Sequence, residues 1–339
     1  MRLLITGGSG FIGTNLVQSC LDKGWQVLNL DWNPPLKAAH RPWWKEWNIM
    51  DGEATRRHLA DFKPTHLVHL AARTDTDVQD DMAAYRQNHE GTAILLQAIK
   101  QAAGIERVII TSTQFVCEAG YQPKDDLDFK PFTLYGETKR LCEMATRGAG
   151  LACTWTIIRP TTIWGPWSLR YRDVLFKVMR KGLYFHPGKG RVVRSYGYVG
   201  NVVWQIEQIL QAAPAAVQGK VFYVGDPPMD LRLWVEAISR ALVGRQVRYI
   251  PTWMVKTLAL CGDALKLLHL PFPITSGRFR SMTSDYITPM DKTEFVLGKA
   301  PWTLEQGARA MVQWYDTESA AAIKPSLIDT RQLQAKEQE

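Results

Sequence analysis

The sequence predicts an α/β protein in which helices cover both faces of a parallel sheet, followed by a smaller, mostly helical second lobe. Apolar runs of strand length alternate with amphipathic stretches of helix length through the first half of the chain. Small, glycine or polar residues end most of these runs, which is typical of strands that pass into loops. The length of 339 residues suits one large domain or two closely packed ones.

Five strands are predicted in the first half, because five apolar runs have the length and composition of buried strands. They cover residues 2–6, 25–30, 66–72, 107–112 and 154–158. Helices are expected at 15–21, at 83–103 and from Tyr135 onward. Residues 33–47 contain two consecutive prolines and three tryptophans, and are expected to form a loop or short helix packed on the sheet edge.

The second half is less regular, and its pattern predicts mostly helices. These are expected at 173–181, 201–212, 231–242, 253–268, 277–282 and 303–315, with strands at 220–224 and 246–250. The nominal boundary gives a first domain over 1–165 and a second lobe over 166–322. The tail, residues 323–339, is polar and expected to be disordered.

Composition is that of a globular protein, with 46% hydrophobic and 22% charged residues. The net charge of +8 indicates an anionic partner. Lys and Arg are scattered without a long basic run, so a phosphorylated small molecule accounts for the charge as well as nucleic acid does. No nucleic-acid partner is predicted. No metal site is predicted either.

The cysteines and the apolar runs indicate a cytoplasmic protein. The five cysteines form no Cys-x-x-Cys pair, and their odd number suits reduced thiols. Met1 and Arg2 lead directly into an apolar run, so no signal peptide is expected. No run of about 18 apolar residues could span a bilayer. The nearest, 253–270, is interrupted by Lys256, Asp263 and Lys266.

The first predicted strand runs into the sequence TGGSGFIG, and a helical pattern follows. Gly7 suits a tight turn, Gly10 a close approach of the backbone to a ligand, and Gly13 close packing of the helix. Phe11 and Ile12 are predicted to contact the coenzyme in this turn, and the N-terminus of the helix that follows would face a pyrophosphate. A strand, a glycine turn and a helix in this order are typical of a Rossmann-type dinucleotide site.

Asp31 ends the second predicted strand, 18 residues after Gly13. A carboxylate there can bind a ribose 2′-hydroxyl and would repel a 2′-phosphate, so NAD is favoured over NADP as the coenzyme. A simple turn residue is the alternative interpretation of Asp31. Asn48 and Ile49, farther along the chain, are placed to suit the adenine edge.

Four residues lie at carboxyl ends of predicted strands, where a doubly wound sheet binds its ligands. These are Gly7, Ala71, Thr113 and Pro160. Ala71 and its neighbour Ala72 are small enough to let a coenzyme approach the sheet.

Tyr135 and Lys139 are predicted to share one face of a helix, because they are four residues apart. A free tyrosine ionises near pH ~10 and is a poor base at neutral pH. A nearby ammonium group favours the phenolate and lowers the pKa of the tyrosine, so the pair suits proton transfer. An exposed helix face is the alternative.

These motifs together resemble an extended short-chain dehydrogenase/reductase of the NAD-dependent epimerase/dehydratase family. The motifs are TGGSGFIG, Asp31, HLAA (69–72), NHEGT (88–92), TST (111–113), YGETK (135–139) and RPTTIWGP (159–166), and the resemblance covers about residues 1–210. It implies NAD as coenzyme, and lobes that interleave, so that residues about 190–212 return to the first domain. It also implies a homodimer formed through helices such as 83–103 and 135–147.

The resemblance implies roles for individual residues. Tyr135 would be the catalytic acid/base, Lys139 would hold the nicotinamide ribose, and Thr113 would orient the reacting oxygen, unless it only ends its strand. Arg194, in the stretch 190–199, would bind the diphosphate of a nucleotide sugar, for which a guanidinium is suited. A solvated strand edge is the alternative for Arg194. Other basic residues gather nearby, at 170, 172, 189 and 191.

Two departures from the family pattern bear on the substrate. Thr162 stands where nucleotide-sugar members often carry an asparagine that contacts the diphosphate. Gln114 and Phe115 follow Thr113, where the dehydratases carry an Asp-Glu pair, and neither residue is a general acid or base, so a dehydratase is rejected.

Residues 251–275 are unusually apolar and resemble 3β-hydroxysteroid dehydrogenase-like members. This stretch is expected to be a lid, a membrane-surface helix or, by preference, ordinary core.

The leading hypothesis is an NAD-dependent epimerase or oxidoreductase that acts on a sugar hydroxyl of a nucleotide sugar through a keto intermediate. Tyr135 would take the proton while hydride passes to the nicotinamide. The alternative is a 3β-hydroxysteroid-dehydrogenase-like oxidoreductase of a hydrophobic alcohol. A coenzyme-binding module without catalysis belongs to a different class, and the presence of Thr113, Tyr135 and Lys139 argues against it.

Overall fold

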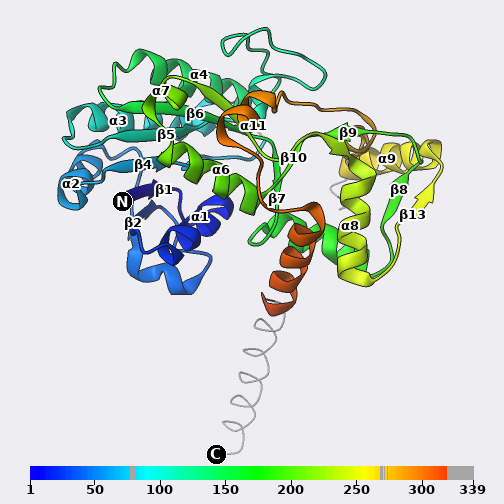
Figure 1. Cartoon of the computed structure of the whole chain (residues 1–339). Coiled ribbons are helices and arrows are strands. Elements are labelled where there is room, and N and C mark those ends of the chain that lie inside the picture. Colours follow the sequence, from blue (N-terminus) through cyan, green and yellow to red (C-terminus); the bar gives the residue numbers. More distant parts are fainter. Residues whose placement is uncertain (77–80, 268–269, 271, 273, 319–339) are drawn as a thin grey trace, which may run out of the picture.

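The structure is a computed structural model and describes residues 1–76, 81–267, 270, 272 and 274–318. Its larger part is built on a sheet of seven strands that all run parallel (Figure 1). In spatial order they are β11 (Val221–Val224), β6 (Thr154–Pro160), β5 (Arg107–Thr111), β4 (His66–His69), β1 (Arg2–Thr6), β2 (Gln26–Asp31) and β3 (Trp44–Glu46). The doubly wound fold predicted from the sequence is confirmed.

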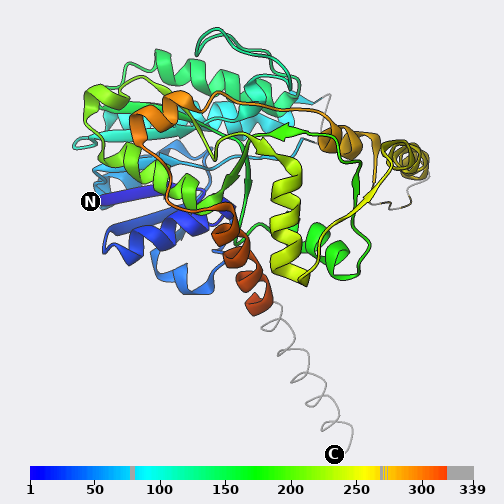
Figure 2. The ribbon, with the colours of Figure 1, turned by 45° about the vertical axis from the view of Figure 1, so that its right-hand side comes forward.

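Helices cover both faces of this sheet (Figures 1 and 2). On one face, Leu3 and Ile5 of β1 pack with α1 (Phe11–Asp22) and α6 (Val199–Gln211). On the other face, Leu4 packs with α2 (Gly52–Phe62) and α3 (Arg86–Gln101), beside α4 (Leu134–Gly148). Successive side chains of a strand point to opposite faces, so a strand covered on both sides reads as an unbroken apolar run.

Side-chain caps set the starts of two of these helices. The carboxylate of Asp51 accepts a hydrogen bond from the backbone N–H of Ala54 at 2.9 Å, at the start of α2. The hydroxyl of Thr133 accepts one from the N–H of Gly136 at 3.0 Å, at the start of α4. Such caps satisfy N–H groups that have no partner inside the helix. The cap at Thr133 therefore places Tyr135 in the first turn of α4.

The second lobe consists of short strand pairs and helices. The pairs are β7 (Thr162–Trp164) with β10 (Tyr196–Tyr198), β8 (Phe185–Pro187) with β13 (Arg248–Ile250), and β9 (Val193–Arg194) with β12 (Met229–Asp230). The helices are a π-helix (Tyr171–Phe176), α5 (Lys177–Arg180), α8 (Leu231–Val243), α9 (Thr252–Leu267) and α10 (Ser276–Thr283). Helix α9 lies at the outer end of this lobe, away from the main sheet (Figures 1 and 2).

The remaining elements connect these parts or follow them. They are 3-10 helices at Ala38–Trp43, Met82–Tyr85 and Gln114–Val116, α7 (Pro214–Val217), α11 (Asp291–Leu297), and a helix over 304–318. None of the helices in the described ranges is long and apolar enough to cross a membrane.

One hydrophobic core joins the two lobes. It begins on the α1 and α6 face of the sheet, includes Ile158 of β6, and continues through Trp164 and Phe176 to Trp234 of α8. Because interiors pack densely, a core shared in this way holds the second lobe in a fixed relation to the sheet.

The structure differs from the predicted elements at several places. β11 belongs to the main sheet, where it pairs with β6, although the predicted boundary puts these residues in the second lobe. β3 and α2 were not predicted, because β3 has only three residues and α2 carries few apolar side chains. Trp47 is buried, as expected for a core tryptophan, whereas Trp43 is 38% exposed. The tail predicted to be disordered lies outside the described residues.

Candidate active site

The turn after β1 brings backbone segments close together. Gly7 has a φ of +74°, and a Cβ on it would lie 2.5 Å from the backbone nitrogen of Ala71. A Cβ on Gly13 would lie 2.2 Å from the carbonyl oxygen of Gly7. Helix α1 starts at Phe11, after Gly10, without a side-chain cap and without an acidic residue in its first turn. Its first N–H groups are therefore available to an anion such as a pyrophosphate.

Asp31 lies beside this turn. One carboxylate oxygen accepts a hydrogen bond from the backbone N–H of Ser9 at 3.0 Å, and the other accepts one from Asn33 at 2.9 Å. Burial raises the pKa of the carboxyl above its ordinary value, and the backbone N–H groups partly offset that rise. The structure thus places Asp31, which is predicted to bind a ribose, next to the glycine turn that is predicted to bind the pyrophosphate.

The two residues predicted at the adenine edge occupy different environments. Asn48 is exposed, and its side-chain oxygen accepts a hydrogen bond from the N–H of Met50 at 3.0 Å. Ile49 packs on α3, where a Cβ on Gly91 would lie 2.8 Å from its side chain. Ile49 therefore contributes to helix packing as well as to any contact with a coenzyme.

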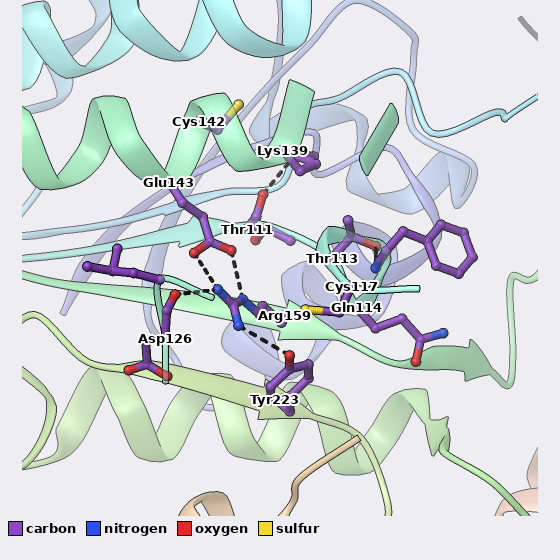
Figure 3. Close-up of polar contacts among 12 residues, drawn as sticks. Thr111, Thr113, Gln114, Cys117, Asp126, Lys139, Cys142, Glu143, Arg159 and Tyr223 are labelled. Carbon is purple, nitrogen blue, oxygen red and sulfur yellow. Dashed lines mark hydrogen bonds and ion pairs between the residues drawn. The ribbon is translucent and has the colours of Figure 1, made fainter. Parts of the chain in front are cut away.

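The three predicted catalytic residues come together between the end of β5 and the start of α4. Burial raises the pKa of Tyr135, and a hydrogen bond with the side chain of Thr113 partly offsets this rise. The ammonium of Lys139 is buried and donates a 2.8 Å hydrogen bond to the carbonyl of Thr111 (Figure 3). Burial lowers the pKa of Lys139. Besides burial, the groups that change the pKa of Tyr135 are Thr113 and Cys142. A lowering of this pKa by Lys139 therefore stays a prediction.

Asn88, in the buried face of α3, ties the segment after β4 to α4. Its amide exchanges hydrogen bonds with the backbone of Arg73, with its oxygen accepting at 2.8 Å and its nitrogen donating at 2.9 Å. The same nitrogen donates to the hydroxyl of Thr138 at 3.2 Å. Asn88 therefore supports the edge of the site through buried contacts.

His69, at the end of β4, lies behind α4. Its Nδ1 is 2.7 Å from the hydroxyl of Thr6, and its Nε2 is 3.0 Å from that of Thr92. Burial, and to a lesser extent the nearby charge of Lys139, lower the pKa of His69 to about 3. The imidazole is therefore neutral at physiological pH, and it links β1, β4 and α3.

Arg159 and Glu143 form a fully buried ion pair beside the predicted catalytic residues (Figure 3). The guanidinium makes two hydrogen bonds to the carboxylate, each 2.8 Å long. It also donates to the hydroxyl of Tyr223 at 3.2 Å and to the carbonyl of Asp126 at 2.8 Å. The arginine therefore fixes β6, α4, β11 and the loop before α4 to one another.

The two residues that depart from the family pattern contact each other. The side-chain nitrogen of Gln114 donates a 3.0 Å hydrogen bond to the hydroxyl of Thr162. The side-chain oxygen of Gln114 is buried and has no partner among the described residues. The hydroxyl of Tyr286 lies 3.0 Å from the carbonyl oxygen of Gln114 and 2.6 Å from that of Cys117, which holds this turn in place. Gln114 therefore offers an acceptor next to Thr113.

Three arginines of the second lobe converge on one region, and we call them the arginine cluster: Arg170, Arg194 and Arg278. The charges of Arg170 and Arg194 both reach Tyr171 and Tyr196, where they oppose the rise in pKa caused by burial. Burial lowers the pKa of Arg278, and the charge of Arg170 adds to that effect. Arg170 and Arg194 form no ion pair with the described acidic residues. The two guanidinium groups of Arg170 and Arg194 are therefore suited to a diphosphate.

Arg194 itself is 9% exposed, so the alternative of a solvated strand edge is wrong. It donates a 3.0 Å hydrogen bond to the carbonyl of Ser284 and lies over the ring of Tyr286. Arg172, predicted in the same basic group, pairs with Asp173 on the surface instead. Arg172 is therefore not part of the arginine cluster.

Buried aromatic residues form the wall beside the cluster. The Trp234 ring contacts the rings of Tyr196, Tyr171 and Trp164, with centroids 4.9 to 5.9 Å apart. The indole N–H of Trp234 is buried without a partner in the described ranges. Sequence reasoning missed Trp234 and Arg278, because they belong to no motif and lie far along the chain from Arg194.

The residues present fit a dinucleotide. The turn around Gly7 and Gly13 leaves no room for side chains, and Asp31 lies next to it. Thr113 and Tyr135 lie at the same carboxyl edge of the sheet. Such an arrangement can bind a pyrophosphate, accept a ribose hydroxyl and move a proton at a third point.

Comparison with known proteins agrees with this geometry. Residues 3–225 match the NAD dependent epimerase/dehydratase family. An N-acetyl-alpha-D-glucosaminyl-diphospho-ditrans,octacis-undecaprenol 4-epimerase of Escherichia coli O157:H7 is 28% identical over 92% of this chain and 95% of its own length. A 3-beta-hydroxysteroid dehydrogenase of Mycolicibacterium neoaurum is 29% identical over 60% of this chain and 58% of its own. A UDP-glucose 4-epimerase of Thermotoga maritima shares the fold, with a TM-score of 0.72 and 21% identity. The match covers 94% of this chain and 99% of the epimerase.

Proposed function

This chain belongs to the NAD dependent epimerase/dehydratase family, and from that premise we propose that it is an epimerase of a sugar carried on a diphosphate. It is an NAD-dependent enzyme of the short-chain dehydrogenase/reductase type. The reaction proposed is oxidation of a sugar hydroxyl to a ketone, followed by reduction from the opposite face. A dehydrogenase would release the ketone instead.

The residues that would hold NAD are those at the carboxyl edge of the sheet. The backbone from Gly7 to Gly13 would bind the pyrophosphate, and Asp31 the adenosine ribose. Ala71, Ala72 and Pro160 would line the path of the coenzyme, and Asn48 and Ile49 the adenine edge. When bound, NAD supplies the acceptor and donor of hydride.

The chain itself supplies proton transfer and orientation. Tyr135 would take the hydroxyl proton of the sugar as it becomes a ketone and return it in the second half of the reaction. Thr113, within hydrogen-bond reach of Tyr135, would hold the same oxygen. Lys139, whose ammonium donates to the carbonyl of Thr111, would hold the nicotinamide ribose. Its charge would then favour the tyrosinate.

One observation supports a diphosphate-linked substrate above the others: Arg170 and Arg194 of the arginine cluster lie close together in the second lobe and form no ion pair with the described acidic residues. A steroid alcohol has no group that would use these guanidinium charges. Thr162, held by Gln114, occupies the place of a common diphosphate ligand of the family and would line the same site. The alternative, a hydrophobic alcohol, is therefore less well supported.

The carrier on the other side of the diphosphate has two candidates. A nucleoside is the carrier that the family resemblance implies. A polyprenyl lipid is the second, and it is favoured by the relative from Escherichia coli, which matches almost the whole chain.

The test is turnover with NAD of a UDP-hexose, a polyprenyl-diphosphate hexose and a steroid alcohol, with sugar epimers followed by NMR. We expect epimers from a diphosphate-linked sugar. Arg194→Ala should weaken binding of that substrate about ten- to a hundredfold, because it removes charge-assisted hydrogen bonds. Arg191→Ala, an exposed arginine three residues away, is the matched control. Turnover of the steroid alone would contradict the proposal.

Assembly and location complete the proposal. We propose a homodimer in which α3 and α4 of two copies pair, supported by Met144 of α4, which is 44% exposed on that side of the sheet. Sedimentation of wild type and Met144→Lys tests it, since a charge at the interface should produce monomers. We further propose a cytoplasmic location, supported by five cysteines that form no disulfide.

A further inference from the structure

Helix α9 presents apolar side chains to solvent. Val255, Ala259 and Gly262 share one face and are buried against the lobe. At 3.6 residues per turn, the opposite face carries Trp253 and Leu260. Trp253 is 69% exposed and Leu260 is 58% exposed. The two apolar faces explain why this stretch reads as core in the sequence, although only one of them is covered.

The exposed apolar residues continue around the helix and beyond it. We call this set the α9 surface: Trp253, Met254, Leu258, Leu260 and Leu270. Every member is at least 40% exposed. Single exposed apolar residues are ordinary, but a contiguous patch at one end of a molecule marks an interaction site.

Positive charge surrounds the α9 surface. Lys256 of α9, Arg248 of β13 and Arg280 of α10 are all exposed in the elements that adjoin it. The chain as a whole carries a net charge of +8. A helix with an apolar outer face and flanking cations is typical of segments that lie in the interface of an anionic membrane. At about 1.5 Å per residue, its 16 residues are too short to span the hydrocarbon.

The α9 surface is connected to the arginine cluster through α10. A Cβ on Gly262 of α9 would lie 1.9 Å from the carbonyl oxygen of Ile274, so helix and connection are in direct contact. The N–H of Ser276, at the start of α10, donates a 3.1 Å hydrogen bond to the carboxylate of Asp263. Arg278 lies two residues farther along, in the same first turn of α10. A group bound at the arginine cluster therefore lies one helix away from the α9 surface.

We propose that the α9 surface docks on an anionic phospholipid membrane, and that the enzyme takes its diphosphate-linked sugar from a lipid carrier in that membrane. The carrier part of this inference rests on the proposed function. The diphosphate would bind the arginine cluster while the lipid remains in the bilayer beside α9. Leu260 and Trp253 would enter the acyl boundary, and Lys256 would meet the headgroups.

Docking can be measured without turnover. Cys261 is exposed on α9, whereas Cys20, Cys117 and Cys142 are buried. In a Cys153→Ser background, the full chain is labelled at Cys261 with an environment-sensitive fluorophore and mixed with phosphatidylglycerol/phosphatidylcholine vesicles. We expect the emission to brighten and shift to the blue, and the response to weaken as salt is raised.

Substitutions separate docking from general stickiness. Trp253→Ser combined with Leu260→Ser should weaken vesicle binding at least about tenfold, because two large apolar side chains no longer enter the membrane. Phe295→Ser is the matched control, since Phe295 is 91% exposed on α11 and should leave vesicle binding unchanged. The double variant should also lose activity on a vesicle-borne polyprenyl-diphosphate sugar while keeping activity on a water-soluble diphosphate sugar.

Several outcomes would overturn the inference. One is the absence of any change in emission with anionic vesicles. Another is brightening that rises with protein concentration without vesicles, which would assign the surface to a second copy. Equal, salt-independent binding to neutral vesicles would show that docking does not require anionic lipid. If docking is observed but no diphosphate-linked sugar is turned over, the proposed function fails and the docking surface stands.

Discussion

Helices α4 and α9 depart from the usual pattern of a surface helix in opposite directions. α4 buries polar side chains, among them Tyr135, Lys139 and Glu143. α9 exposes apolar ones, among them Trp253 and Leu260. A helix that only supported the fold would bury its apolar residues and expose its polar ones. Neither departure is expected of a helix that only supports the fold, so each points to a further task.

The difference between the two helices fits the two tasks proposed for them. The buried polar groups of α4 have partners inside the molecule, such as Thr111 for Lys139 and Arg159 for Glu143. Such groups are fixed before any ligand arrives, as catalysis requires. The apolar groups on the outside of α9 have nothing covering them in the described part of the chain, as a docking surface requires.

The largest effect is expected from the hydroxyl at the start of α4. Tyr135→Phe should lower kcat about a hundred- to ten-thousand-fold, because it removes proton transfer, and should leave NAD affinity and stability nearly unchanged. Steady-state kinetics on the true substrate measure this effect. Tyr249→Phe, which also removes a phenol hydroxyl but lies in β13, is the control. If Tyr135→Phe keeps the wild-type kcat, α4 is not the catalytic helix.

The buried ion pair of α4 should dominate stability. Arg159→Met should lower the free energy of unfolding by about 3–5 kcal/mol, because it leaves the carboxylate of Glu143 buried without its charge partner. Combining it with Glu143→Met should recover much of the loss, since neither charge then remains. Denaturant titrations of the single and double variants measure both. A double variant as unstable as the single one would argue against this account.

Acid should destabilise the region behind α4. The pKa of His69 is about 3 in the folded chain and near 6.5 when unfolded, chiefly because of burial. The unfolded chain therefore binds the proton first, so this contribution is complete above pH ~6.5 and falls as the pH drops toward 3. Between pH 6.5 and 4.5 the loss is about 2 kcal/mol. His69→Gln should flatten the pH dependence of unfolding in that window, and an unchanged slope would contradict the assignment.

The smallest effect is expected on the outside of α9. Leu260→Ser should change the free energy of unfolding by less than about 0.5 kcal/mol, since an exposed side chain contributes little to the fold. Val255→Ala, on the buried face of the same helix, should cost more than about 1 kcal/mol. Thermal melts of the two variants compare the faces directly. A large loss from Leu260→Ser would show that this side of α9 belongs to the core.

The same pair of helices shows how far the sequence could predict the structure. Everything needed for α4 is local: Thr133 caps it, and Tyr135 and Lys139 fall on one face by spacing alone. The existence of α9 was also predictable, but its orientation was not. Its apolar residues surround the helix, and the inner face is chosen by contact of Gly262 with Ile274. Ordinary core, the preferred interpretation of this stretch, holds only for that inner face.

The residues of the site also divide into those that the sequence could predict and those that it could not. Gly7, Asp31 and Thr113 were found because parallel strands bring their carboxyl ends to one edge. Arg194 was found by resemblance to a known stretch. Arg278 was not, because its place beside Arg170 depends on how α10 packs, and no local pattern encodes that. The contact of Gln114 with Thr162 was hidden for the same reason, although each residue was noticed alone.

The hydroxyl of Tyr286 has a consequence for how the enzyme is made. It closes the turn at Gln114 and Cys117, residues that precede it by 172 and 169 positions. During synthesis the coenzyme half can form its sheet early, but this turn stays without its last support until the second lobe has emerged. A nascent or truncated chain would therefore bind coenzyme before this turn is in place to support a reaction.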